Sequence, residues 1–154
     1  MTRRRVVVTG LGLVTPVGNT VEESWQNLTA GQSGIDTITR FDASAMSVQF
    51  AGEVKGFKIE DYIPAKEARH MDIFIHYGLA ASLQAVKDSG LPTGDALSPE
   101  MAERIGCLVG SGIGGLPMIE GTHKDYTEKG ARRISPFFVP ASIINMISGH
   151  VSIK

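Results

Sequence analysis

Cysteine is almost absent from this sequence, with a single residue, Cys107, among 154. One cysteine excludes an internal disulfide. It lies inside the apolar run 105–109, and this context favours a structural role, because a reactive thiolate requires exposure and positive surroundings. The four histidines (His70, His76, His123 and His150) show no spacing typical of a metal site, so we expect no metal.

Long apolar runs and an excess of charge of either sign are absent as well. No apolar run approaches the roughly 18 residues of a membrane span. The run that follows the basic start, residues 6–8, is too short for the core of a signal peptide. The formal net charge of −1 gives no reason to expect a nucleic-acid partner. These absences favour a cytoplasmic globular protein with no nucleic-acid and no membrane partner.

Strand-like and helix-like segments alternate along the chain, which favours a layered α/β fold. Short β-branched or apolar runs predict strands at 5–9, 48–54 and 104–109. Apolar residues at three- and four-residue steps, with caps at their ends, predict helices. We expect these helices from Thr20 to Gly31, over 71–88, over 99–102 behind Ser98, from 116 to Gly130, and from Pro140 onward.

The helix over 71–88 has the clearest pattern. Its apolar residues form one stripe, and Gly90 and Pro92 end it. Lys66 and Arg69 bring positive charge together just before it. On charge alone such a cluster is most often a solvated helix end, and a dock for a carrier or a phosphate is the less common interpretation.

Four glycines fall within residues 110–115, Gly-Ser-Gly-Ile-Gly-Gly. By their letters, Gly110, Gly112 and Gly115 complete G-x-G-x-x-G, the fingerprint of a dinucleotide phosphate loop. That loop requires an acidic residue about 20 positions further on, at the end of a second strand. Here the count reaches residues 128–130, where a helix ends, so the context does not fit. The other interpretation is a turn that presents Ile113 to an apolar ligand.

Several stretches, taken together and in order, resemble the chain-elongating β-ketoacyl-acyl-carrier-protein synthases, and most closely the type II form of bacterial fatty-acid synthesis. Each motif alone is weak, whereas the set is specific and extends from one end of the chain to the other. The stretches are RVVVTGLG at 5–12, TPVG at 15–18, GQSGI at 31–35, GSGIGG at 110–115, ISPFFVP at 134–140, and NM at 145–146 with GH at 149–150.

The resemblance implies a thiolase-like fold layered as αβαβα, a homodimer, and decarboxylative condensation of an acyl thioester with malonyl carrier protein. It implies no organic cofactor and no metal. In the family the nucleophilic cysteine lies in a Thr-Ala-Cys stretch, and two histidines support decarboxylation. No position here matches any of the three, and Cys107 and His150 belong to other motifs. We therefore expect residues 1–154 to be the N-terminal part of such an enzyme, an incomplete first half that is inactive alone.

Residues that match supporting positions of the family motifs are the candidate site. Ile113 matches an isoleucine that borders the acyl channel. Phe137 and Phe138 match a pair near that pocket and the dimer interface, with Phe138 the better candidate for lining. The basic residues that match carrier-protein docking positions are Lys66, Arg69, Arg132 and Arg133; His70 stands where relatives can carry lysine.

Two other functional classes remain open alternatives. One is a Rossmann-type NAD(P)-binding oxidoreductase built on the glycine stretch, although Pro16 is unfavourable for a second such loop after the first strand. The other is a non-catalytic piece that binds carrier protein through its basic residues.

Overall fold

The computed structural model describes residues 3–154, and most of their regular structure is helical. The elements, in chain order, are α1 (Val21–Thr29), β1 (Ile35–Thr37), β2 (Phe50–Gly52), η1 (Ile59–Asp61), α2 (Ala65–Ala68), α3 (Ile73–Ser89), η2 (Gly94–Ala96), α4 (Pro99–Ala102), α5 (Leu116–Lys129), η3 (Ala131–Arg133), α6 (Phe138–Ser142) and α7 (Met146–Ile153).

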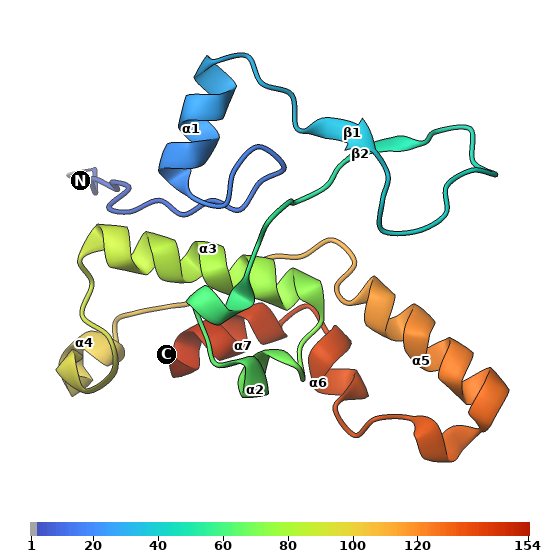
Figure 1. Ribbon diagram of the computed structural model, residues 1–154. Helices are drawn as coiled ribbons and strands as arrows, with labels where there is room; N and C mark the ends of the chain where they lie inside the picture. Colours follow the sequence, from blue (N-terminus) through green and yellow to red (C-terminus); the bar gives the residue numbers. More distant parts are fainter. Residues whose placement is uncertain (1–2) are drawn as a thin grey trace.

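Helix α3 is the centre of the packed part of the molecule, with α7 alongside it (Figure 1). Ile75 and Leu79 of its apolar stripe have no exposed surface, and the other members of the stripe are partly buried. Leu79 packs with Ile59 and Ile63 in the main hydrophobic cluster. A Cβ on Gly78 would lie 2.7 Å from the Ile147 side chain, so this glycine lets α3 and α7 approach closely.

The segment before α1 crosses α3 at equally short range. A Cβ on Gly12 would collide with the carbonyl oxygen of Ala81, and one on Gly10 would collide with that of Ala85. The first glycine pair of the sequence therefore packs on a helix backbone. Such contacts leave no space for the phosphates that a dinucleotide loop would hold there.

The predicted helix caps are confirmed. The Thr20 hydroxyl accepts from the Glu23 N–H at 3.1 Å, and the Glu23 carboxylate accepts from the Asn19 N–H at 2.7 Å. This reciprocal pair resembles a capping box. It differs in that the Glu23 carboxylate accepts from the residue before the N-cap and not from the N-cap residue itself. Ser98 caps α4 in the same way, with Pro99 in its first turn. Gly90 ends α3 in the left-handed conformation at φ 70°.

Two of the predicted strands are wrong within residues 3–154. Residues 5–9 and 104–109 are not in strands, and Val6 and Leu108 are 94% and 97% exposed. A strand exists only where a neighbour takes its backbone hydrogen bonds. The described part of the chain offers none to these segments. The strand predicted at 48–54 is confirmed as β2, which pairs antiparallel with β1.

The helix predicted from Pro140 onward is also corrected, because it is two helices. Helix α6 ends at Ser142, Ile143 is extended at ψ 141°, and α7 begins at Met146. The interruption turns the chain, so that α7 lies on α3 while α6 meets the glycine stretch.

Candidate functional site

The second half of the glycine stretch is fixed against α6. The N–H of Gly115 donates to the carbonyl of Ser142 at 2.9 Å. Gly114 has φ 84°, and a Cβ there would lie 2.5 Å from the same carbonyl oxygen. A Cβ on Gly115 would lie 2.8 Å from the Ser142 Cα. Both positions require glycine, one for its conformation and both for the close approach of two backbones.

The first half of the stretch is open by comparison. Within residues 3–154 no atom beyond the chain neighbours comes within 4 Å of a Cβ built on Gly110 or Gly112. Ile113, between the two halves, is 71% exposed. The turn thus leaves the apolar side chain of Ile113 exposed while its base is fixed to α6; that it presents Ile113 to an apolar ligand stays a prediction.

Helix α5 begins directly after this turn, and the carboxylate of Asp72 caps it. Oδ2 of Asp72 accepts from the N–H of Met118 at 2.7 Å, and the residue is only 5% exposed. A dinucleotide fold places a pyrophosphate at this helix N-terminus. Here a buried carboxylate already occupies that end, and it would repel a second anion. The geometry therefore argues against the oxidoreductase alternative.

Sequence reasoning missed Asp72 as a residue of this site. Its place before a periodic apolar segment is the pattern of an N-cap, and the residue does occupy the N-cap position of α3. However, its side chain makes no capping bond to α3 and bonds 46 residues away instead. No local pattern indicates that choice, because it depends on how α3 and α5 pack.

The two aromatic candidates begin α6. Phe137 is its N-cap residue and is 43% exposed, while Phe138 is half-buried. The structure places them on the helix whose other end, Ser142, holds the glycine turn. It thus connects the Phe137–Phe138 pair to the turn of Ile113 through one short helix.

The basic candidates lie in two places. Lys66 is in α2, and Arg69 is its C-cap residue; Arg132 and Arg133 are in η3, at the far end of α5 (Figure 1). All four are exposed. The His70 ring stacks on the Phe137 ring with centroids 3.9 Å apart, so the end of α2 meets the start of α6.

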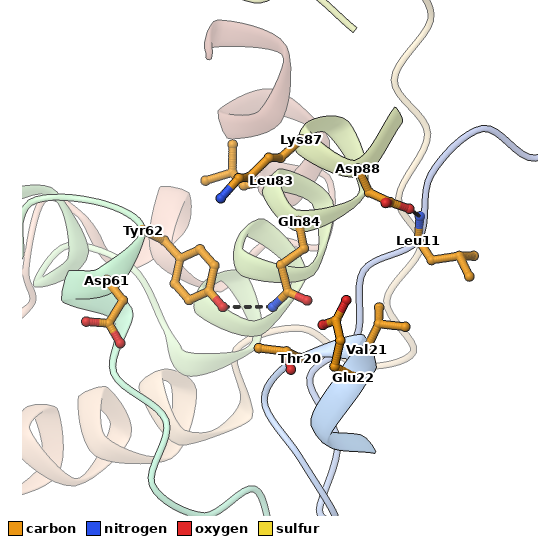
Figure 2. A pocket seen from close by; sticks show the side chains of 10 residues that line it. All are labelled: Leu11, Thr20, Val21, Glu22, Asp61, Tyr62, Leu83, Gln84, Lys87 and Asp88. Atoms are coloured by element: carbon orange, nitrogen blue, oxygen red, sulfur yellow. Dashed lines mark hydrogen bonds between the residues drawn. The ribbon is translucent and has the colours of Figure 1, made fainter. Parts of the chain in front are cut away.

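A hollow that the sequence did not predict has a volume of about 790 Å³ and lies between α1, η1 and α3 (Figure 2). Gln84 organises its wall. Its Nε2 donates to the Tyr62 hydroxyl at 2.7 Å and to the Asn19 carbonyl at 2.8 Å, and its Oε1 accepts from the Leu13 N–H at 3.2 Å. Asp88 accepts from the Leu11 N–H at 2.8 Å. These bonds anchor the segment before α1 to α3.

A second hollow, of about 440 Å³, lies beside the start of α5. Asp72, Met118 and Arg133 are among the residues that line it. The lining of this hollow therefore includes both Asp72, the buried cap of α5, and Arg133, one of the basic docking candidates.

Residues 3–154 contain no group of three or more His, Cys, Asp or Glu side chains that could hold a metal ion. The helices described are all too short or too polar to cross a membrane. Cys107 is half-buried and forms no disulfide, and it lies in an irregular segment instead of the predicted strand. Burial lowers the pKa of His150 below the ordinary 6.5, the Glu67 carboxylate opposes this effect, and Lys154 adds to it.

Solved structures that superpose on this chain show which class of protein it resembles. The chain superposes on the ishigamide ketosynthase/chain length factor with a TM-score of 0.78 at 27% identity, over 99% of this chain and 37% of that one. It superposes on AntDE, a ketosynthase solved in complex with its type II polyketide acyl-carrier protein, with a TM-score of 0.74 at 28% identity, over 98% of this chain and 38% of that one. The chain thus has the structure of an N-terminal portion of the thiolase-like fold of ketosynthases, as predicted.

The sequence comparison then gives the family. A model of the family described as "Beta-ketoacyl synthase, N-terminal domain" matches residues 3–154, and the chain belongs to this family. It is 57% identical over 153 residues to 3-oxoacyl-[acyl-carrier-protein] synthase 2 of Vibrio cholerae, and 50% identical over 150 residues to the enzyme of the same name from Staphylococcus aureus. These matches cover 99% and 97% of this chain, but only 36% and 35% of the two relatives.

Proposed function

We propose that residues 1–154 form the N-terminal part of a 3-oxoacyl-[acyl-carrier-protein] synthase that elongates fatty acids. The observation that carries the proposal is the 57% identity with the Vibrio cholerae synthase over 99% of this chain. The chain spans about a third of that relative's length. The exposed segments 5–9 and 104–109 support the proposal, because apolar, strand-forming residues of this kind are what a larger sheet incorporates as strands.

The reaction proposed for the whole enzyme has two covalent stages. A cysteine thiolate attacks the thioester of an acyl carrier protein, and the acyl group passes to the cysteine as the carrier thiol leaves. Malonyl carrier protein then loses carbon dioxide, and the resulting enolate attacks the acyl-cysteine carbonyl. The carbon–sulfur bond breaks, which releases 3-oxoacyl carrier protein and the free cysteine. No position of this chain matches that nucleophile or the two histidines that assist.

The contribution proposed for this chain is therefore binding and shape. Ile113, with Phe138 and Phe137, borders the acyl chain, and the tight packing of Gly114 and Gly115 on α6 keeps that wall in position. A rigid wall discriminates between acyl chains because one methylene too many must find space in a closed pocket.

The basic candidates are proposed to receive the carrier protein. Lys66, Arg69, Arg132 and Arg133 are all exposed. Lys66 and Arg69 belong to α2, whose end meets the start of α6 through the His70–Phe137 stack, and Arg132 and Arg133 follow α5 directly in the chain. An acidic carrier helix would meet them through solvent-exposed contacts, which speed association and weaken as salt increases. The structural neighbour AntDE is a ketosynthase in complex with its acyl-carrier protein, which supports a partner of this kind.

We place the enzyme in the cytoplasm as a homodimer. The support for a partner subunit is α5, which buries none of its residues within the described structure. Leu116, Ile119 and Tyr126 on this helix are 53%, 41% and 50% exposed. An apolar helix face left uncovered in this way is typical of an interface.

A hybrid enzyme tests the proposal. This chain replaces the segment that it matches in the Vibrio cholerae synthase, and the hybrid is given acyl and malonyl carrier protein. We expect 3-oxoacyl carrier protein and carbon dioxide in equal amounts, and none from residues 1–154 alone, which supply no nucleophile. A hybrid that folds with native circular dichroism and yields no product would refute the proposal.

A further inference from the structure

His70 joins two parts of the proposed site that the sequence treats separately. On one side, Nε–H of Arg69 donates to Nε2 of His70 across 3.0 Å. On the other side, the imidazole stacks on the Phe137 ring, with centroids 3.9 Å apart and planes inclined by 26°. A guanidinium nitrogen can only donate, so Nε2 of His70 is the acceptor of this bond. One ring therefore contacts both a docking candidate and an acyl-pocket candidate.

Arg69 retains the means to bind an acidic partner while it is bonded to His70. A guanidinium carries five N–H donors, and the bond to His70 uses only the one on Nε. The two terminal NH₂ groups form the fork that pairs with a carboxylate. A carboxylate that engages this fork orients the guanidinium plane, and the plane fixes the direction of the Nε–H toward His70.

Phe137 is connected in turn to the wall of the acyl pocket. Its N–H donates to the Ser135 hydroxyl at 3.1 Å, and its carbonyl accepts from the Ala141 N–H at 2.8 Å, within the first turn of α6. The last residue of α6, Ser142, holds Gly115 at 2.9 Å. A change in the position of the Phe137 ring thus acts on the short helix that carries Phe138 and anchors the turn of Ile113.

We infer that His70 is a positioning residue: it couples the docking of an acidic carrier helix at Arg69 to the orientation of Phe137. The inference rests on the proposed function, because it requires a carrier protein that docks at Arg69. It goes further in assigning His70 a role distinct from adding positive charge to the docking surface. The coupling needs both the hydrogen-bond acceptor and the stacked ring.

The experiment places 4-fluorophenylalanine at position 137 of the hybrid synthase and follows its fluorine resonance while acyl carrier protein is added. Calorimetry measures binding in the same samples. With His70 present we expect the resonance to shift in proportion to the carrier bound. His70→Asn removes the ring, and His70→Phe keeps a ring but removes the acceptor. Both variants should lose the shift and retain affinity within about fivefold, the range of one exposed contact. His123→Asn, on the exposed face of α5, is the matched control and should behave like the parent.

Two results would overturn the inference and leave the proposed function standing. In one, the carrier binds but the resonance of residue 137 does not move. In the other, it moves equally in the parent and in the His70 variants. Absence of any binding by calorimetry would instead refute docking of the carrier at this surface, and the inference with it.

Discussion

Replacing Gly115 by alanine separates a packing role of the glycine stretch from a phosphate-binding role. The new Cβ would lie 2.8 Å from the Ser142 Cα and 3.1 Å from the Ala141 carbonyl oxygen, both backbone atoms that cannot rotate away. Carbon atoms prefer about 3.5–4.0 Å. Overpacking of this kind costs about 1–3 kcal/mol. We therefore expect Gly115→Ala to loosen α6 from the turn.

Gly112→Ala is the matched control, because Gly112 is a glycine of the same motif as Gly115 but has open space around it. Among residues 3–154 no atom lies within 4 Å of a Cβ at position 112, and its φ is not positive. The free energy of unfolding should then change by less than about 0.5 kcal/mol, as at other exposed positions. A dinucleotide loop would make the opposite demand, since its backbone must approach a ligand at each glycine of the motif.

Amide hydrogen exchange over α6, read by mass spectrometry, measures the difference. A local cost of about 1–3 kcal/mol corresponds to exchange about 5- to 150-fold faster when opening and closing are fast relative to exchange, so that the rate follows the opening equilibrium. We expect that acceleration in Gly115→Ala and little change in Gly112→Ala. Equal exchange in the two variants, or faster exchange only in Gly112→Ala, would refute the packing argument.

Two further predictions concern charge. In the hybrid synthase, the double variant Lys66→Glu with Arg69→Glu should raise the KM for carrier substrates about tenfold, since each reversal removes one exposed attraction and adds a repulsion. The control variant Lys87→Glu lies at the other end of α3, roughly 20 Å away at 1.5 Å per residue, and should leave this KM unchanged. Equal effects of the two changes would count against docking at α2. Because burial lowers the pKa of His150, the unfolded chain binds that proton more tightly than the folded chain does, so stability should fall as the pH drops below 6.5. Thermal melting across this range should show a weaker pH dependence in His150→Gln than in His123→Gln, and identical slopes would exclude the effect.

The parts of the fold that the sequence predicts well are those fixed by near neighbours. The capping box at Thr20 and Glu23, the serine cap of α4 and the left-handed Gly90 each depend on residues within four positions. The buried stripe of α3 is equally local in origin, because helical spacing alone puts Ile75 and Leu79 on one face.

The parts that the sequence does not predict depend on distant neighbours. Residues 5–9 and 104–109 have strand composition, but no described segment pairs with them. Asp72 leaves its own helix to cap α5, a choice set by tertiary packing. The stack of His70 on Phe137 joins positions 67 residues apart and has no signature in either local sequence. For the candidate site, motif resemblance supplies the candidate residues, whereas only the structure shows that α6 connects Phe137 and Phe138 to the glycine turn.

The exposed Ile113 gives the most direct test of the central claim, that the glycine turn forms a wall of an acyl pocket. In the hybrid synthase, Ile113→Phe should narrow the pocket, so that short acyl carriers are elongated as before and long ones lose kcat/KM. Ile113→Val, which keeps a branched side chain and removes one methylene, should leave the chain-length profile unchanged or extend it slightly. Rates measured across acyl carriers of increasing length give the answer. A profile identical in the parent and in Ile113→Phe would contradict the account.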